Sequence, residues 1–264
     1  MRRVALILLL AVLAALLFGC GNNEDFSVVQ GAVENTNAVK RYKANFVTDL
    51  TFENGSATLL FMQGEYSIDR EKQIMSSSYV ESYLGASSSL VERYFDGYVY
   101  TDIDINKTKY QRSADELFGY MYFSEPIAFE EKDIKNLSVR NSSEGTLYSF
   151  TVKSGYDEQL LKLMGEGIYA LAHITKPQTE KTRFSDINVE YIIAENGEGE
   201  PILASRQMVF TMHLYQTPAY TPWYTPPESD YRLDLKVRIK VSYKDFGDEV
   251  EIQQPIIEDY SDLE

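Results

Sequence analysis

The chain has one cysteine, two histidines and one tryptophan among its 264 residues. A single cysteine cannot form a disulfide bond within the chain, so the fold must be held together by a packed core. The histidines, His173 and His213, lie far apart and lack the spacing of zinc ligands. An ordinary surface or core role is expected for each of them. We therefore predict no metal site and no cofactor.

Basic residues are also scarce. The chain has 25 Lys and Arg against 40 Asp and Glu, which gives a formal net charge of −15. A domain this acidic repels the phosphate backbone of nucleic acids and anionic lipid headgroups. Binding of nucleic acid through a basic patch is therefore excluded.

The motifs of common enzyme mechanisms are missing as well. The sequence contains no G-x-S-x-G elbow, no H-E-x-x-H zinc motif and no P-loop. A glycosidase with two distant carboxylates leaves no local motif, so that class stays open as a minor alternative. The prediction is a protein that is not an enzyme and has no catalytic residue.

The chain has a single long apolar run, over residues 4–18. It lies between Arg2-Arg3 and Gly19-Cys20. A basic start, an uncharged apolar stretch and a small residue at its end are typical of a secretory signal peptide. The run is shorter than the ~20 residues that a membrane-spanning helix needs. The alternatives are an uncleaved transmembrane helix and an ordinary signal peptide that happens to contain a cysteine.

The sequence Leu17-Phe18-Gly19-Cys20 resembles the lipobox of bacterial lipoproteins. The resemblance implies cleavage between Gly19 and Cys20 and attachment of a diacylglyceryl group, which carries acyl chains such as palmitate, to the Cys20 thiol. Two or more acyl chains hold a protein durably on a membrane. We expect the protein to be anchored on the extracytoplasmic face of the cell membrane. The expected organisation is a signal peptide over residues 1–19, a lipidated N-terminus and short tether over 20–25, and a single domain over 26–264.

Most of that domain has the pattern of antiparallel strands. Apolar and polar residues alternate with a period of two over residues 42–52 and again over 232–243. Turn pairs such as Asp96-Gly97 join neighbouring strands as hairpins. Helical spacing is confined to three segments, residues 26–42, 113–123 and 154–174. The pattern predicts an α+β domain, with a curved antiparallel sheet and a few helices on one face.

Two stretches resemble a known group of lipoproteins. They are "YFDGYVYTDIDINKTKYQ" (residues 94–111) and "VRIKVSYKDFGDEVEIQQP" (residues 237–255). The second has a Phe246-Gly247 turn and a short last strand running into Pro255. Both are similar to proteins of the LolA/LppX-like superfamily, and the likeness of layout covers residues 25–257. The resemblance implies an unclosed β half-barrel, with helices on its concave face and a lipid or other hydrophobic ligand in its cavity.

On this resemblance, the apolar faces of the strands line the ligand cavity. Methionine and aromatic side chains on these faces adapt well to a flexible acyl chain. An ordinary filled core has the same pattern, so it stays the alternative for each residue. The candidate cavity residues are Phe46, Leu50, Met62, Met208, Phe210, Met212, Leu235, Val237 and Ile239.

A stretch rich in proline and aromatic residues separates the last two long strands at residues 216–230. Its prolines exclude it from the interior of a sheet. Tyr220, Trp223 and Tyr224 are predicted at the tip of a lid or docking loop, and the alternative is that they pack back onto the sheet. A docking loop of this kind indicates a second function, a cell-envelope interaction module that binds a protein or a glycan.

Overall fold

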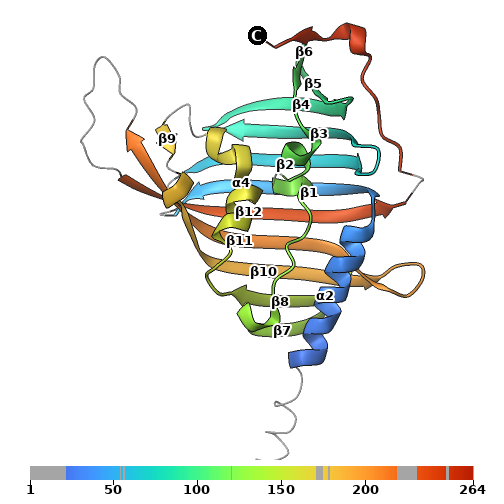
Figure 1. Ribbon diagram of the computed structural model, residues 1–264, viewed down its shortest axis with the longest axis vertical. Helices are drawn as coiled ribbons and strands as arrows, with labels where there is room; N and C mark the ends of the chain where they lie inside the picture. Colours follow the sequence, from blue (N-terminus) through green and yellow to red (C-terminus); the bar gives the residue numbers. More distant parts are fainter. Residues whose placement is uncertain are drawn as a thin grey trace, which may run out of the picture.

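The computed structural model describes residues 22–263, with gaps at 54, 56, 120, 171–174, 178, 219–230 and 248–249. The described residues form one large curved sheet with helices packed on a single face (Figure 1). The predicted signal peptide and Cys20 lie outside the described residues.

The secondary structure is mostly strand. The strands are β1 (Arg41–Phe52), β2 (Thr58–Asp69), β3 (Ile74–Tyr83), β4 (Ala86–Phe95), β5 (Tyr98–Ile103), β6 (Asn106–Gln111), β7 (Ile134–Ser142), β8 (Gly145–Val152), β9 (Thr175–Pro177), β10 (Arg183–Glu195), β11 (Pro201–Pro218), β12 (Tyr231–Phe246) and β13 (Ser261–Asp262). The helices are α2 (Asn22–Ala38), α3 (Ala114–Phe118) and α4 (Asp157–Ala170), with 3-10 turns η1 (Met121–Phe123), η2 (Glu131–Asp133), η4 (Thr179–Lys181) and η5 (Ile257–Asp259).

The strands follow the order β13-β6-β5-β4-β3-β2-β1-β12-β11-β10-β8-β7, and β9 pairs with β11. All neighbours are antiparallel except β13 and β6. Among the described strands, β7 and β13 end the sheet on opposite sides and do not pair with each other, so the sheet is open. The predicted α+β fold with an unclosed antiparallel half-barrel is confirmed.

Residues from the two ends of the domain meet at the centre of the sheet. Strand β1 lies beside β12, with Phe46 opposite Val241 and Leu50 opposite Val237. Alternate side chains of both strands are buried on the concave face, as a period-two pattern dictates. The two-residue turn at Asp96-Gly97 has φ of 51° and 79°, the left-handed backbone that a tight hairpin requires.

Helix α2 covers part of this concave face. Phe26, Val29 and Val33 are buried from the helix side. The Thr36 hydroxyl donates to the Ala32 carbonyl and accepts from the Leu203 backbone amide of β11, at 2.7 and 3.0 Å. These contacts fix the C-terminal end of α2 on the sheet.

The helix predicted over residues 113–123 is partly wrong. Ser113 caps α3 as expected, since its hydroxyl accepts from the Glu116 backbone amide at 3.3 Å. The helix ends at Phe118, however, and η1 follows with all three side chains buried. Burial of these large side chains in the sheet outweighs the local preference for continuing the helix.

The short last strand predicted to run into Pro255 is also wrong. Residues 250–256 form no strand, and the tail instead continues to the far edge of the sheet, where β13 pairs with β6 (Figure 1). The Tyr260 ring packs edge-on against Tyr100, with centroids 5.1 Å apart, and Arg93 donates to the Tyr260 hydroxyl at 3.1 Å. The tail therefore covers an edge that a terminal hairpin would have left exposed.

Candidate functional site

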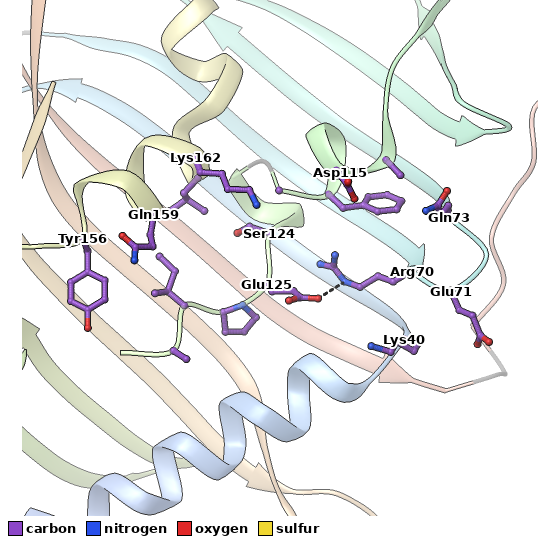
Figure 2. A pocket seen from close by; sticks show the side chains of 17 residues that line it. Lys40, Arg70, Glu71, Gln73, Asp115, Ser124, Glu125, Tyr156, Gln159 and Lys162 are labelled. Carbon is purple, nitrogen blue, oxygen red and sulfur yellow. Dashed lines mark ion pairs between the residues drawn. The ribbon is translucent and has the colours of Figure 1, made fainter. Parts of the chain in front are cut away.

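A pocket of about 1090 Å³ opens on the concave side, between α3, α4 and the chain after η1. Figure 2 shows the side chains that surround it, which come from segments far apart in the sequence. The lining residues are Lys40, Arg70, Glu71, Gln73, Ala114, Asp115, Phe118, Gly119, Ser124, Glu125, Pro126, Ile127, Ala128, Tyr156, Gln159, Lys162 and Leu163. This volume is slightly above the range of about 300–1,000 Å³ typical of small-molecule sites.

One part of the pocket wall is apolar. Phe118 comes from the end of α3, Leu163 from α4, and Ile127 from the irregular segment between them. Phe118 and Leu163 are buried in the same core cluster as the sheet residues. The apolar wall is therefore continuous with the core, so an apolar group bound here would be removed from water.

The other part of the wall carries three cations, Lys40, Arg70 and Lys162. Figure 2 shows Arg70 and Lys162 pointing into the space from the β2–β3 turn and from α4. The Arg70 guanidinium lies 3.9 Å from the Glu125 carboxylate, and its side chain is 12% exposed. The lining also carries three carboxylates, those of Glu71, Asp115 and Glu125, so the formal charges of the pocket balance.

A buried segment forms one side of the pocket. We call residues 121–129 the plug. Met121, Tyr122 and Phe123 are buried, and the Tyr122 ring stacks on Phe46 of β1 with centroids 3.5 Å apart. The plug therefore occupies the middle of the concave face with protein side chains.

Two arginines hold the backbone of the plug. Arg206 of β11 is only 6% exposed and donates to the carbonyls of Tyr122 and Ser124, at 3.3 and 2.5 Å. Arg70 donates to the carbonyl of Phe123 at 2.5 Å. Three successive carbonyls thus accept charge-assisted hydrogen bonds, which are stronger than neutral ones.

Two tyrosines of the sheet add further anchors. Burial raises the pKa of both Tyr66 and Tyr191, so both hydroxyls keep their protons and act as donors. Tyr66 donates to the Tyr122 carbonyl at 2.9 Å, and Tyr191 donates to the Ile127 carbonyl at 3.3 Å. Because all these bonds go to backbone carbonyls, they leave no signature in the sequence of the plug.

The nine predicted cavity residues all lie on the concave face and are all buried, with exposed fractions of 7% or less. Phe46 lies against the plug, and none of the nine lines the pocket of Figure 2. The alternation in the sequence therefore correctly predicts that the nine residues share one face of the sheet. Whether those residues meet a ligand stays a prediction.

A smaller hollow of about 50 Å³ lies between α2, β8, β10 and the plug. Its apolar wall includes Phe26, Val29 and Phe150, and it is too small for an acyl chain. Ile127 and Ala128 line both this hollow and the large pocket. The plug therefore lies between the large pocket and the small apolar hollow under α2.

The other predicted site residues cannot be placed. Gly19, Cys20 and the loop residues Tyr220, Trp223 and Tyr224 lie outside the described residues, as does His173. The strands on either side of the loop end at Pro218 and begin at Tyr231. Sequence reasoning missed the pocket cations because no local pattern marks three basic residues from three distant segments.

No known family model matches the chain. No curated protein matches it in sequence either. Among solved structures, LprF from Mycobacterium bovis is similar over 87% of this chain and 95% of that chain, with 8% identity and a TM-score of 0.46. A β-barrel-like protein of a domain of unknown function from Brucella abortus is similar over 79% of this chain and 100% of that chain, with 10% identity and a TM-score of 0.21. Because both TM-scores are below 0.5, neither similarity indicates a function for this chain.

None of the helices in the described part of the chain has the length and apolarity needed to cross a bilayer.

Proposed function

We propose that the protein is a lipoprotein anchored through Cys20 on the extracytoplasmic face of the cell membrane, and that its half-barrel binds an acyl-chain amphiphile with an anionic headgroup. The ligand class rests on the pocket of Figure 2, which has an apolar wall on one side and, on the other, three cations interspersed with three carboxylates. Sites for small molecules combine such an apolar wall with a few placed polar groups.

The loosely paired guanidinium of Arg70 favours an anionic headgroup. The protein as a whole repels anions, and the cations of the pocket are balanced by carboxylates, so an anionic ligand gains only where it replaces a carboxylate beside a cation. Arg70 is the best placed of the three, because its guanidinium is already fixed by the Phe123 carbonyl and the Tyr42 hydroxyl. Its bond with Glu125 at 3.9 Å is loose enough for a carboxylate or phosphate to replace it.

The apolar wall favours an acyl chain. Phe118, Ile127 and Leu163 offer a surface that a small polar ion would leave in contact with water. A chain longer than the pocket would reach the nine concave residues only by displacing the plug. We therefore expect long chains to bind with movement of residues 121–129 and short ones without it.

The ligand is tested by photo-crosslinking of the full chain in its membrane. A palmitate analogue with a diazirine at mid-chain is added, irradiated and located by peptide mass spectrometry. We expect labels in peptides that contain Phe118 and Leu163, and loss of these labels when Leu163→Trp fills the pocket. Val80→Trp, at an exposed position on β3, is the control. Equal labelling of the Leu163→Trp and parent chains would show that the acyl chain binds elsewhere.

Anchoring is tested separately with alkyne-labelled palmitate in growing cells. The parent chain should incorporate the label covalently, and Cys20→Ser should abolish both the label and the recovery of the protein with membranes. Incorporation that survives the substitution would refute an anchor at Cys20. This result is independent of the pocket, so the two halves of the proposal can fail separately.

A further inference from the structure

Three polar side chains form a hydrogen-bonded chain on the outer face of the sheet. The Ser185 hydroxyl lies 2.9 Å from His213 Nε2, and His213 Nδ1 lies 2.7 Å from the Asp234 carboxylate. These residues belong to β10, β11 and β12. Their neighbours Phe184, Met212 and Leu235 are buried on the concave side, so the three side chains point away from the helices.

Strand register brings the three together. His213 and Asp234 are direct cross-strand partners in the β11–β12 pair. Ser185 is opposite Thr211 in the β10–β11 pair and therefore lies diagonally across from His213. The side chains of His213 and Asp234 are 19% and 22% exposed, so the group is partly shielded and still open to solvent.

The connectivity is that of a Ser-His-Asp triad, which is recognised by geometry and not by sequence position. The Asp234 carboxylate can only accept, so the proton of the imidazole sits on Nδ1. The neutral ring then presents the lone pair of Nε2 to the Ser185 hydroxyl, as a general base does. Arg232, at 2.6 Å, and then His213 lower the pKa of Asp234, which keeps it ionised.

One further carboxylate competes for the serine proton. Asp186 lies 2.9 Å from the Ser185 hydroxyl, at a point where the β10–β11 register shifts and where Asp186 has φ of 52°. The hydroxyl has one proton, so it serves either His213 or Asp186. When the imidazole carries two protons, Nε2 donates to Ser185 and the serine donates to Asp186. When the ring is neutral, the serine donates to Nε2.

We propose that Ser185, His213 and Asp234 form a nucleophilic site that cleaves accessible carboxylic esters. Ser185 Oγ attacks the carbonyl carbon while its proton moves to His213 Nε2. The bond to the leaving oxygen breaks, and that oxygen takes the proton and departs as an alcohol. Water, activated by the same nitrogen, then releases the acid and restores the serine. This site is distinct from the concave pocket and does not depend on the proposed ligand.

The test uses the full chain in detergent with a fluorophosphonate probe. The serine oxygen bonds to phosphorus, fluoride leaves, and the proton passes to His213. We expect a label on Ser185, located by mass spectrometry, and hydrolysis of p-nitrophenyl acetate. Ser185→Ala should abolish the label, while Ser87→Ala, in the exposed β3–β4 hairpin, should not change it. Equal labelling of the parent and a folded Ser185→Ala chain would overturn the proposal.

Two aspartate variants distinguish a catalytic role of the group from a purely structural one. They also test the proposal if Ser185→Ala does not fold. Asp234→Asn should slow labelling by a factor of ~10² or more, because the imidazole loses its orientation and tautomer. Asp186→Asn removes the competing acceptor and should leave labelling equal or faster. A network that only joins strands would give the same rate in both variants, and that result would overturn the proposal.

Discussion

The ring of Tyr122 lies almost parallel to that of Phe46, with 7° between their planes and 3.5 Å between their centroids. Tyr122 belongs to the plug, and Phe46 belongs to the central strand of the sheet. Phe46 also contacts the rings of Tyr66 and Tyr79, at 6.1 and 5.9 Å. This single stacked pair therefore joins the plug to an aromatic cluster that spans β1, β2 and β3.

Removing the Phe46 ring should destabilise the protein strongly. Phe46 is 1% exposed, and the plug and strands around it cannot fully collapse into the space that Phe46→Ala leaves. We expect a loss of ~3–5 kcal/mol in the free energy of unfolding, measured with urea. Phe61→Ala, at a half-buried position on β2, is the matched control and should cost less. Equal losses would contradict the prediction, because removing the buried, stacked ring would then cost no more than removing a half-buried one.

Replacing the buried arginine should loosen the plug. Arg206→Met keeps the length of the side chain but removes the donor to the Ser124 carbonyl, while the Tyr122 carbonyl keeps its bond from Tyr66. A buried acceptor without a partner costs ~1–3 kcal/mol, which favours opening of the plug. We expect faster amide exchange in residues 121–126, seen by hydrogen–deuterium mass spectrometry, while β12 stays protected.

Arg238→Met is the control for this substitution. Arg238 lies on the outer face and pairs with Asp49 at 2.6 Å, with 47% of its side chain exposed. An exposed pair of this kind contributes little to stability. Unchanged exchange of the plug in Arg206→Met would show that Arg70 and the two tyrosines are sufficient to hold it.

The half-barrel follows from local patterns, whereas the pocket and the Ser185–His213–Asp234 group depend on contacts between segments far apart in the sequence. Alternation in β1 and β12 and the Asp96-Gly97 turn are properties of short windows, so they predict strands and hairpins correctly. The predicted helix extends wrongly into residues 121–123 of the plug, because the sequence alone does not reveal that Arg206 and Phe46 bind Tyr122. Tertiary contacts of this kind override propensity.

The group of Ser185, His213 and Asp234 on the outer face of the sheet is even harder to predict from the sequence. The sequence predicts only an ordinary role for His213, because a lone histidine carries no information about its partners. Ser185 and Asp234 lie in different strands, and only the register of β10, β11 and β12 places them on either side of the imidazole. No motif search finds such an arrangement, since the sheet order itself is the missing information.

Releasing the C-terminal tail should expose the β6 edge. Tyr260 is 8% exposed, and its ring and hydroxyl contact Tyr100 and Arg93. Tyr260→Ala should detach β13, whose pairing with β6 spans only two residues. An open strand edge pairs with other molecules, so we expect a concentration-dependent oligomer by light scattering. Ile256→Ala, at a position 66% exposed, should stay monodisperse, and a monodisperse Tyr260→Ala would contradict the covering role of the tail.

The pH dependence of stability should carry a signature of Glu81. Burial raises the pKa of the Glu81 carboxyl above its ordinary value of 4.5. At a pH between the unfolded-state and folded-state pKa values, the folded chain therefore holds a proton that the unfolded chain has lost. The free energy of unfolding therefore falls as the pH rises from the pKa of Glu81 in the unfolded state through its pKa in the folded state. Below the unfolded-state pKa the carboxyl is protonated in both states, so it causes no loss of stability there. Glu81→Gln should raise the urea midpoint at pH values above both pKa values and leave it unchanged in acid. Glu198→Gln, in an exposed turn, should leave the midpoint alone in both conditions. A Glu81→Gln midpoint shifted equally at low and neutral pH would show that packing, and not the buried charge, is what the substitution changes.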